Sequence, residues 1–130
     1  MKLLIGIGII VVIVSITFFH KKTLTNDEMM DKAIFYSEQN LKKDVKMPES
    51  LQTRNVSFGG HRTDIDGLTG AVCGEFAAKN GDGKMTTYSY FVQSIEVDKK
   101  GELVSMGRVL YPVQNEAVFE ALCSKTKKAH

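Results

Sequence analysis

The sequence predicts an α+β fold: an N-terminal transmembrane helix, then a long helix packed on a four-stranded antiparallel meander, with a short C-terminal helix. Three observations support it: an uncharged apolar segment at the start, a capped stretch with helical spacing of apolar residues, and alternating segments separated by glycine-rich turns. The chain has 130 residues, 43% of them apolar and 25% charged, a composition typical of folded proteins. We expect a signal anchor at 1–22 and one domain at 23–130.

The apolar segment Leu3–Phe19 contains seventeen residues without a charge. A helix of that length spans about 25 Å, slightly less than the ~30 Å hydrocarbon core, and Lys2 and Lys21 can reach the headgroups. A cleaved signal peptide is the alternative. Its apolar region is usually about 7–15 residues long and precedes small residues at the cleavage site, whereas this segment ends in Phe18 and Phe19. An uncleaved signal anchor is therefore expected.

The orientation of the anchor depends on the cysteines, because lysines flank both ends of the segment. The chain has two cysteines, Cys73 and Cys123. In an exported domain such a pair is most simply a disulfide, whereas in the cytosol it would be two buried thiols. We expect a Cys73–Cys123 disulfide that closes a loop of about fifty residues and contributes up to ~4 kcal/mol. The domain is therefore predicted to lie outside the cytoplasm.

The long helix is predicted from about Asn26 to Lys46. Residues 25–28 have the S/T-x-x-E form of a capping box, with acidic residues in the first turn. Apolar and small residues then recur at helical spacing at Met30, Ala33, Ile34, Ser37, Leu41 and Val45. Pro48 ends the helix, because the residue before a proline avoids helical backbone angles.

Four strands are predicted where the apolar spacing changes to two: Asn55–Phe58, Ala71–Ala78, Thr86–Val97 and Leu103–Tyr111. Gly59 and Gly60 are expected to end the first strand, a polar loop runs from His61 to Gly70, and Pro112 closes the fourth. Asn80–Gly83 and Asp98–Gly101 have the composition of hairpin turns.

The last predicted element is a short helix over Asn115–Lys125, with Val118, Phe119, Leu122 and Cys123 at helical spacing. A disulfide from Cys123 to the central strand would attach this helix to the sheet.

The charge balance argues against nucleic-acid binding. Of the 17 lysines and arginines, Lys2, Lys21 and Lys22 flank the anchor, which leaves 14 against 15 acidic residues. Binding of nucleic acid requires clustered positive charge.

No metal or cofactor is expected either: Asp64, Asp66 and the Asn80–Gly83 segment can attract a hard cation, but the distal glutamate of a calcium loop is missing. Such clusters are also ordinary turn sequences.

Catalysis is not expected. Cys73 and His61 are a candidate nucleophile and its base. Cys73 has a disulfide partner, however, and no helix N-terminus precedes it to favour a reactive thiolate. The hydrolase, metalloprotease, P-loop and dinucleotide motifs are also missing. A thiol-dependent enzyme that uses Cys73 remains an alternative.

The predicted contact surface for a partner combines the polar loop with the third strand. Alternating aromatic residues are usually cross-strand packing, but exposed aromatics also form the centres of interfaces. The candidate partner-binding residues are His61, Arg62, Asp64, Asp66, Tyr88 and Tyr90.

Two stretches carry a resemblance. Met47–Val56 (MPESLQTRNV) resembles a D-P-x-S-A-x-F-R-N-V stretch, and Val72–Asn80 (VCGEFAAKN) is similar to V-C-G-x-V-N-A-K-N. Both stretches occur in uncharacterised small exported or membrane-tethered bacterial and phage proteins. The resemblance covers about Leu41 to Val92 and departs from the pattern at Leu51, Thr53 and Ala77. It implies a bacterial or phage envelope protein and supplies no site. Together with the anchor and the cysteine pair, it predicts a single-pass protein of a bacterial inner membrane with its C-terminal domain in the periplasm.

These observations predict a non-catalytic, membrane-tethered envelope domain that binds another envelope protein. It would act as an accessory subunit or an inhibitor, and phage or prophage superinfection exclusion is one such role. A periplasmic domain that senses a ligand between the long helix and the sheet is the alternative.

Overall fold

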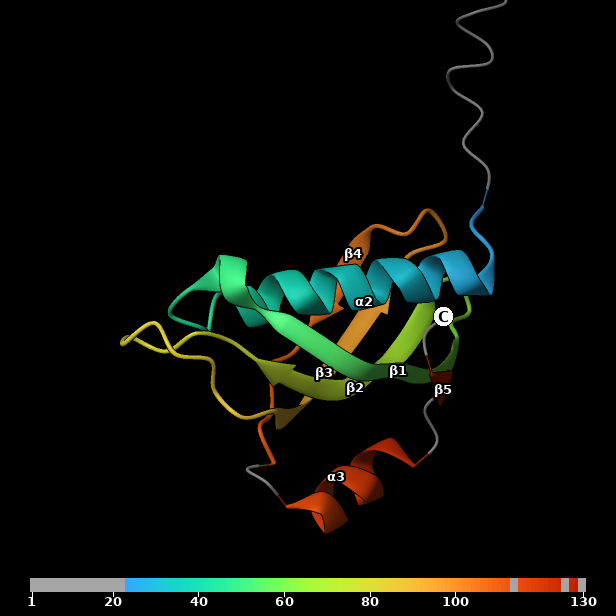
Figure 1. Cartoon of the computed structure of the whole chain (residues 1–130). Helices are drawn as coiled ribbons and strands as arrows, with labels where there is room; N and C mark the ends of the chain where they lie inside the picture. Colours follow the sequence, from blue (N-terminus) through green and yellow to red (C-terminus); the bar gives the residue numbers. More distant parts are fainter. Residues whose placement is uncertain (1–22, 113–114, 125–126, 129–130) are drawn as a thin grey trace, which may run out of the picture.

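The computed structural model describes residues 23–112, 115–124 and 127–128. Its elements follow in the order α2 (Asn26–Lys42), η1 (Pro48–Ser50), β1 (Gln52–Arg62), β2 (Leu68–Ala77), β3 (Ser89–Val97), β4 (Leu103–Met106), α3 (Glu116–Cys123) and β5 (Lys127–Lys128) (Figure 1). The predicted anchor lies outside these residues. None of the helices within them is long and apolar enough to span a bilayer.

The capping box at the start of α2 is confirmed. The Thr25 hydroxyl accepts a hydrogen bond from the Glu28 amide, and the Glu28 carboxylate accepts one from the Thr25 amide, both at 3.2 Å. The helix ends at Lys42, before the predicted Lys46. There the backbone tightens, because the Lys43 amide donates to the Asn40 carbonyl at 3.1 Å, as in many last helical turns.

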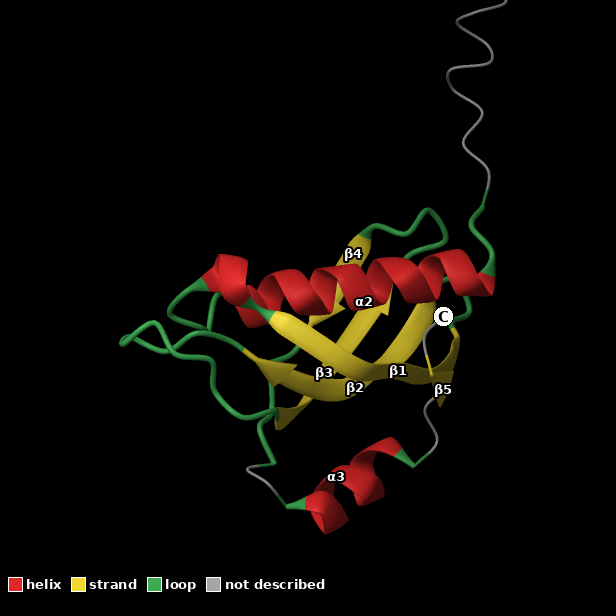
Figure 2. Cartoon of the chain, in the orientation of Figure 1, coloured by secondary structure: helices red, strands yellow, loops and turns green. Residues whose placement is uncertain are grey.

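The strands form one antiparallel sheet in the order β4-β3-β2-β1-β5. The predicted α+β fold with a four-stranded meander is confirmed, and β5 adds an unpredicted fifth strand at the edge beside β1. Helices α2 and α3 lie on opposite sides of the sheet (Figure 2). The domain therefore has three layers, although α3 covers only part of its face.

The predicted end of the first strand at Gly59-Gly60 is wrong, and so are the bounds of the loop after it. Strand β1 continues to Arg62 and β2 begins at Leu68, so 63–67 alone form the loop. A Cβ at Gly60 would lie 2.1 Å from the Thr69 carbonyl oxygen, and one at Gly70 would lie 2.1 Å from the Gly59 carbonyl oxygen. These glycines allow the two backbones to approach closely, which is a recognised use of glycine in strands.

The two predicted turns after β2 and β3 are confirmed. The Asn80 side chain accepts hydrogen bonds from the Asp82 and Lys84 amides. Asp98 does the same for Lys100 and Glu102. The strands after these turns are shorter than predicted: β3 begins at Ser89, and β4 ends at Met106. Beyond Met106, the Gly107 amide donates to the Ser94 carbonyl at 3.0 Å, and an isolated bridge joins Leu110 to Val92.

The two faces of the sheet carry separate hydrophobic clusters. The cluster under α2 contains Met29, Ala33, Leu41, Phe58, Leu68, Val72, Phe91, Ile95, Val97 and Val109. The cluster under α3 contains Cys73, Val92 and Cys123, with Ala71 and Phe119 against it. The α2 side also buries Gln93, whose side-chain amide donates to the Gly107 carbonyl and whose oxygen accepts from Asn40 at 2.8 Å.

Candidate functional site

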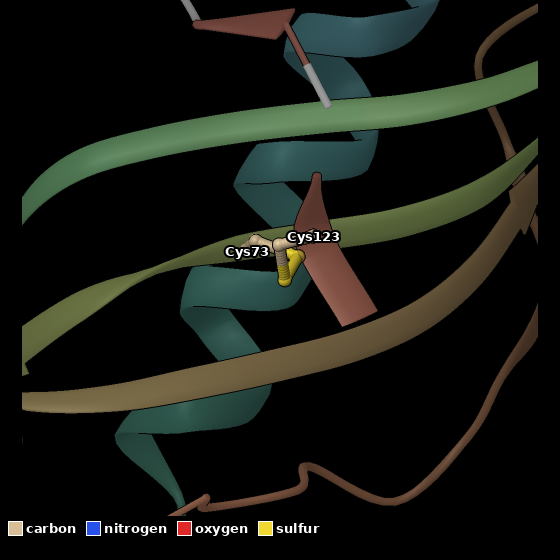
Figure 3. Close-up of a disulfide and its surroundings, with 2 residues drawn as sticks. All are labelled: Cys73 and Cys123. Carbon is tan, nitrogen blue, oxygen red and sulfur yellow. A yellow bond between two sulfur atoms is a disulfide. The ribbon is translucent and has the colours of Figure 1, made fainter. Parts of the chain in front are cut away.

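The predicted disulfide between Cys73 and Cys123 is present, with the two Cα atoms 6.1 Å apart, as is usual for disulfides. Cys73 lies on β2 and Cys123 ends α3. In Figure 3, α2 lies behind the strands, on the other side of the sheet from this bond. The disulfide thus joins α3 to the sheet face that α2 does not cover.

Helix α3 begins after Asn115, whose side chain accepts a hydrogen bond from the Val118 amide at 3.2 Å, a typical N-cap. The helix ends at Cys123, short of the predicted Lys125. With 8 residues it is too short to be stable alone in water. Its helical structure therefore depends on its attachment to the sheet.

The inner side of α3 packs on the sheet through Phe119 and Cys123. The Phe119 ring stacks on the ring of Tyr90 with 4.2 Å between centroids and 19° between planes. The opposite side of the helix is apolar as well: Val118 is 44% exposed and Leu122 is 50% exposed. We call Ala117, Val118, Ala121 and Leu122, which share this exposed side, the α3 outer face.

A cavity of about 330 Å³ lies between α3 and the sheet. We call it the α3 groove. Its lining residues are Asn55, Ser57, Glu75, Tyr90, Glu116, Phe119, Glu120 and Cys123. In the described part of the chain, no three histidine, cysteine or carboxylate side chains converge as a metal site requires.

A bulge in β1 shapes one wall of the groove. The β1–β2 register shifts between Arg54 and Ser57, and Asn55 has a φ of 53°. This places Arg54 at 3.2 Å and the Asn55 amide at 2.7 Å from the Glu75 carboxylate. Burial alone would raise the pKa of Glu75, but the hydrogen bonds from Asn55 and Arg54 and the charge of Arg54 outweigh it, and the pKa lies below its usual value. The Glu75 carboxylate is therefore ionised at neutral pH, and Arg54 and Asn55 hold it in place.

The two tyrosines predicted to bind a partner lie beside the groove. The Arg54 guanidinium covers the Tyr88 ring at 3.8 Å from its centroid, a cation–π geometry. Tyr90 lines the groove itself. Desolvation, together with the negative charges of Glu116, Glu75 and Glu120, raises its pKa. The shift favours the protonated form of the hydroxyl.

The predicted loop residues lie at the other end of the sheet. His61 and Asp64 are exposed. The Arg62 guanidinium donates to the Asp66 carbonyl at 2.7 Å, and Asp66 has a φ of 62°, so both help to form the hairpin turn. His61 is opposite Thr69 and Thr69 is opposite Glu96, whereas Tyr90 is opposite Glu75. Along β3 this separates the loop from Tyr90 by about 20 Å. The structure does not join the two halves of the predicted surface.

The α3 outer face was not predicted from the sequence, although a signal for it was present. Residues 116–123 read EAVFEALC, with apolar residues on two sides of one short helix. A helix attached to a sheet through Cys123 can bury only the side that carries Phe119. The side that carries Val118 and Leu122 must then face outward.

No protein-family model, curated protein or solved structure matches this chain. Any conclusion about function therefore depends on its own residues.

Proposed function

We propose that this chain is a non-catalytic, membrane-tethered domain of the bacterial envelope that binds another envelope protein through the α3 outer face. The observation that carries the proposal is that a short helix, attached by a disulfide, turns Val118 and Leu122 toward solvent. The membrane tether and the periplasmic location belong to the same proposal, and they rest on the apolar segment Leu3–Phe19, the cysteine pair and the resemblance to envelope proteins.

The exposed Val118 and Leu122, on adjacent turns of α3, can contribute free energy to the binding of a partner. Burying each against a partner removes apolar surface from water and stabilises a complex by about 1.5–3 kcal/mol at most. Small apolar areas with a charged rim are typical of protein contacts. Glu116 and Glu120 lie on the same helix beside the outer face, so we expect a partner with basic residues around an apolar centre. One helix of this length offers a small interface, and the complex should be transient.

Ligand sensing is the second candidate, and the α3 groove is the observation that favours it. Its volume of about 330 Å³ is at the lower limit for small-molecule sites. The predicted position of a ligand, between the long helix and the sheet, is instead filled by Met29, Leu41 and Phe91, each 0% exposed. A thiol-dependent enzyme would need Cys73 reduced, since its sulfur is bonded to Cys123.

The proposal is tested by photocrosslinking in living cells. A photoreactive phenylalanine analogue at Val118 of the full-length protein should yield an adduct with one envelope protein. The same analogue at Ile65, 68% exposed, or Phe35, 52% exposed, should not. Leu122→Glu should reduce the adduct from position 118 at least tenfold, since loss of about 1.4 kcal/mol corresponds to that factor. Equal adducts from all three positions, or none from position 118, would count against the proposal.

A further inference from the structure

We infer that the Cys73–Cys123 disulfide is a site of thiol–disulfide exchange for a dithiol protein, attacked at Cys123. Reduction releases α3 from the sheet while α2 and the sheet remain folded. This makes the presence of the α3 outer face depend on the oxidation state of the domain.

The separation of the two hydrophobic clusters supports this inference. Ten buried residues hold α2 on its face of the sheet, and none of them belongs to the cluster under α3. That second cluster has three buried members, Cys73, Val92 and Cys123. The disulfide therefore supplies two of the three buried side chains. The segment is also held by the stack of Phe119 on Tyr90 and, after the helix, by the pairing of β5 with β1 at the edge of the sheet.

The length of α3 determines the effect of reduction. Eight residues do not form a stable helix without tertiary contacts. Once the covalent link is broken, the entropy of the freed segment opposes its return to the sheet. The α2 cluster is unaffected, because Met29, Leu41 and Phe91 lie on the opposite face. Regions of one domain can open separately when few contacts join them, so the expected opening is local.

The surroundings of the two sulfur atoms determine which one is attacked. Cys73 is 0% exposed and sits in the middle of the sheet, paired with Ser57 on β1 and Val92 on β3. Cys123 is also buried, at 8% exposed, but it lines the α3 groove and ends α3. A mixed disulfide needs room for the attached thiol, and the α3 groove offers that room beside Cys123, whereas Cys73 is not part of its lining.

The chemical step balances with a dithiol as the reductant. One thiolate bonds to the Cys123 sulfur, the bond to Cys73 breaks, and Cys73 leaves with the electron pair and takes up a proton. The second thiol of the reductant then displaces Cys123 from the mixed disulfide and forms a disulfide within the reductant. Two electrons pass to the domain, which ends with two thiols. The consequence for partner binding rests on the proposed function; the exchange and the release do not.

Two measurements on the full-length protein in detergent micelles test the inference. Glutathione, a monothiol, followed by iodoacetamide should trap a mixed disulfide on Cys123 at least ten times more often than on Cys73. Dithiothreitol should then raise hydrogen exchange at least tenfold in 116–123 and leave 29–41 and 91–97 unchanged. The double variant Cys73→Ala/Cys123→Ala should reproduce the reduced pattern without reductant.

Three outcomes would overturn the inference: an adduct mainly on Cys73, continued protection of 116–123 after reduction, or loss of protection in α2 together with α3. Because these measurements involve no partner, they separate the inference from the proposed function. Local release of α3 combined with no adduct at position 118 in cells would refute the proposed function alone.

Discussion

Phe91→Ala is expected to lower the free energy of unfolding by about 4 kcal/mol, within the range of such core truncations. Phe91 is 0% exposed on β3, and its ring meets Phe76 edge-on at 6.1 Å between centroids. A Cβ at Gly74 would lie 3.0 Å from the Phe91 ring, so this ring fills the space over the glycine. Removing it leaves a cavity between α2 and the sheet. Small domains have only about 5–15 kcal/mol in total.

The check is urea denaturation followed by circular dichroism, on the chain from Thr23 onward. Phe35→Ala provides the matched control, because Phe35 is 52% exposed on α2 and its removal should change the free energy of unfolding by less than about 1 kcal/mol. Similar losses for the two variants would mean that Phe91 is not the centre of the α2 cluster.

Gly70→Ala is expected to lower the free energy of unfolding by about 3 kcal/mol, at the upper end of typical overpacking effects. The new methyl group would lie 2.1 Å from the Gly59 carbonyl oxygen and 2.6 Å from the Gly60 Cα. Backbone atoms of a paired strand cannot rotate out of the way as a side chain can. The β1–β2 hairpin must therefore separate locally and lose hydrogen bonds near its turn.

Thermal and urea unfolding of Gly70→Ala should be compared with those of Gly107→Ala. A Cβ at Gly107 would have Ser94 Cβ as its nearest neighbour, at 3.6 Å, an ordinary contact. That control should change the free energy of unfolding by less than about 1 kcal/mol. If the two alanines behave alike, the close approach of β1 and β2 is not a requirement of the fold.

Local signals in the sequence were sufficient for several elements. The capping box at Thr25 and the two turns at Asn80 and Asp98 use side chains that bond to backbone a few residues away, so a short window contains all the partners. Along β3, Phe91 and Gln93 alternate with Tyr90 and Val92, and this alternation correctly assigns the two pairs to opposite faces of the sheet.

The pairing of strands that are distant in the sequence could not be predicted from such local signals. Gly59 and Gly60 look like a strand end, because glycine weakens strands in general. Only the register, which places Gly60 opposite Gly70, shows why a glycine is needed at position 60. Likewise, β5 is a two-residue strand without an apolar pattern, and its position opposite Ser57 and Phe58 depends on the path of the chain after Cys123.

In the candidate site, too, some features could be predicted from the sequence and others depend on long-range contacts. The cysteine pair predicted that α3 is attached to the sheet, because two cysteines allow only one disulfide within the chain. The register of β2 and β3, which sets Tyr90 far from His61, was not available from the pattern of residues. The outward direction of Val118 and Leu122 depends on which side of α3 contacts Tyr90, and this tertiary contact cannot be predicted from the local sequence.

We propose that the domain lies outside the cytoplasm on a membrane tether, with its disulfide formed. The most direct test treats spheroplasts of a Gram-negative host that expresses the full-length protein with external protease and, in parallel, with a thiol reagent without reductant. We expect external protease to digest the domain, and we expect Cys73 and Cys123 to react with the reagent only after reduction. A domain that resists protease until the membrane is lysed, with both thiols reactive at once, would contradict it.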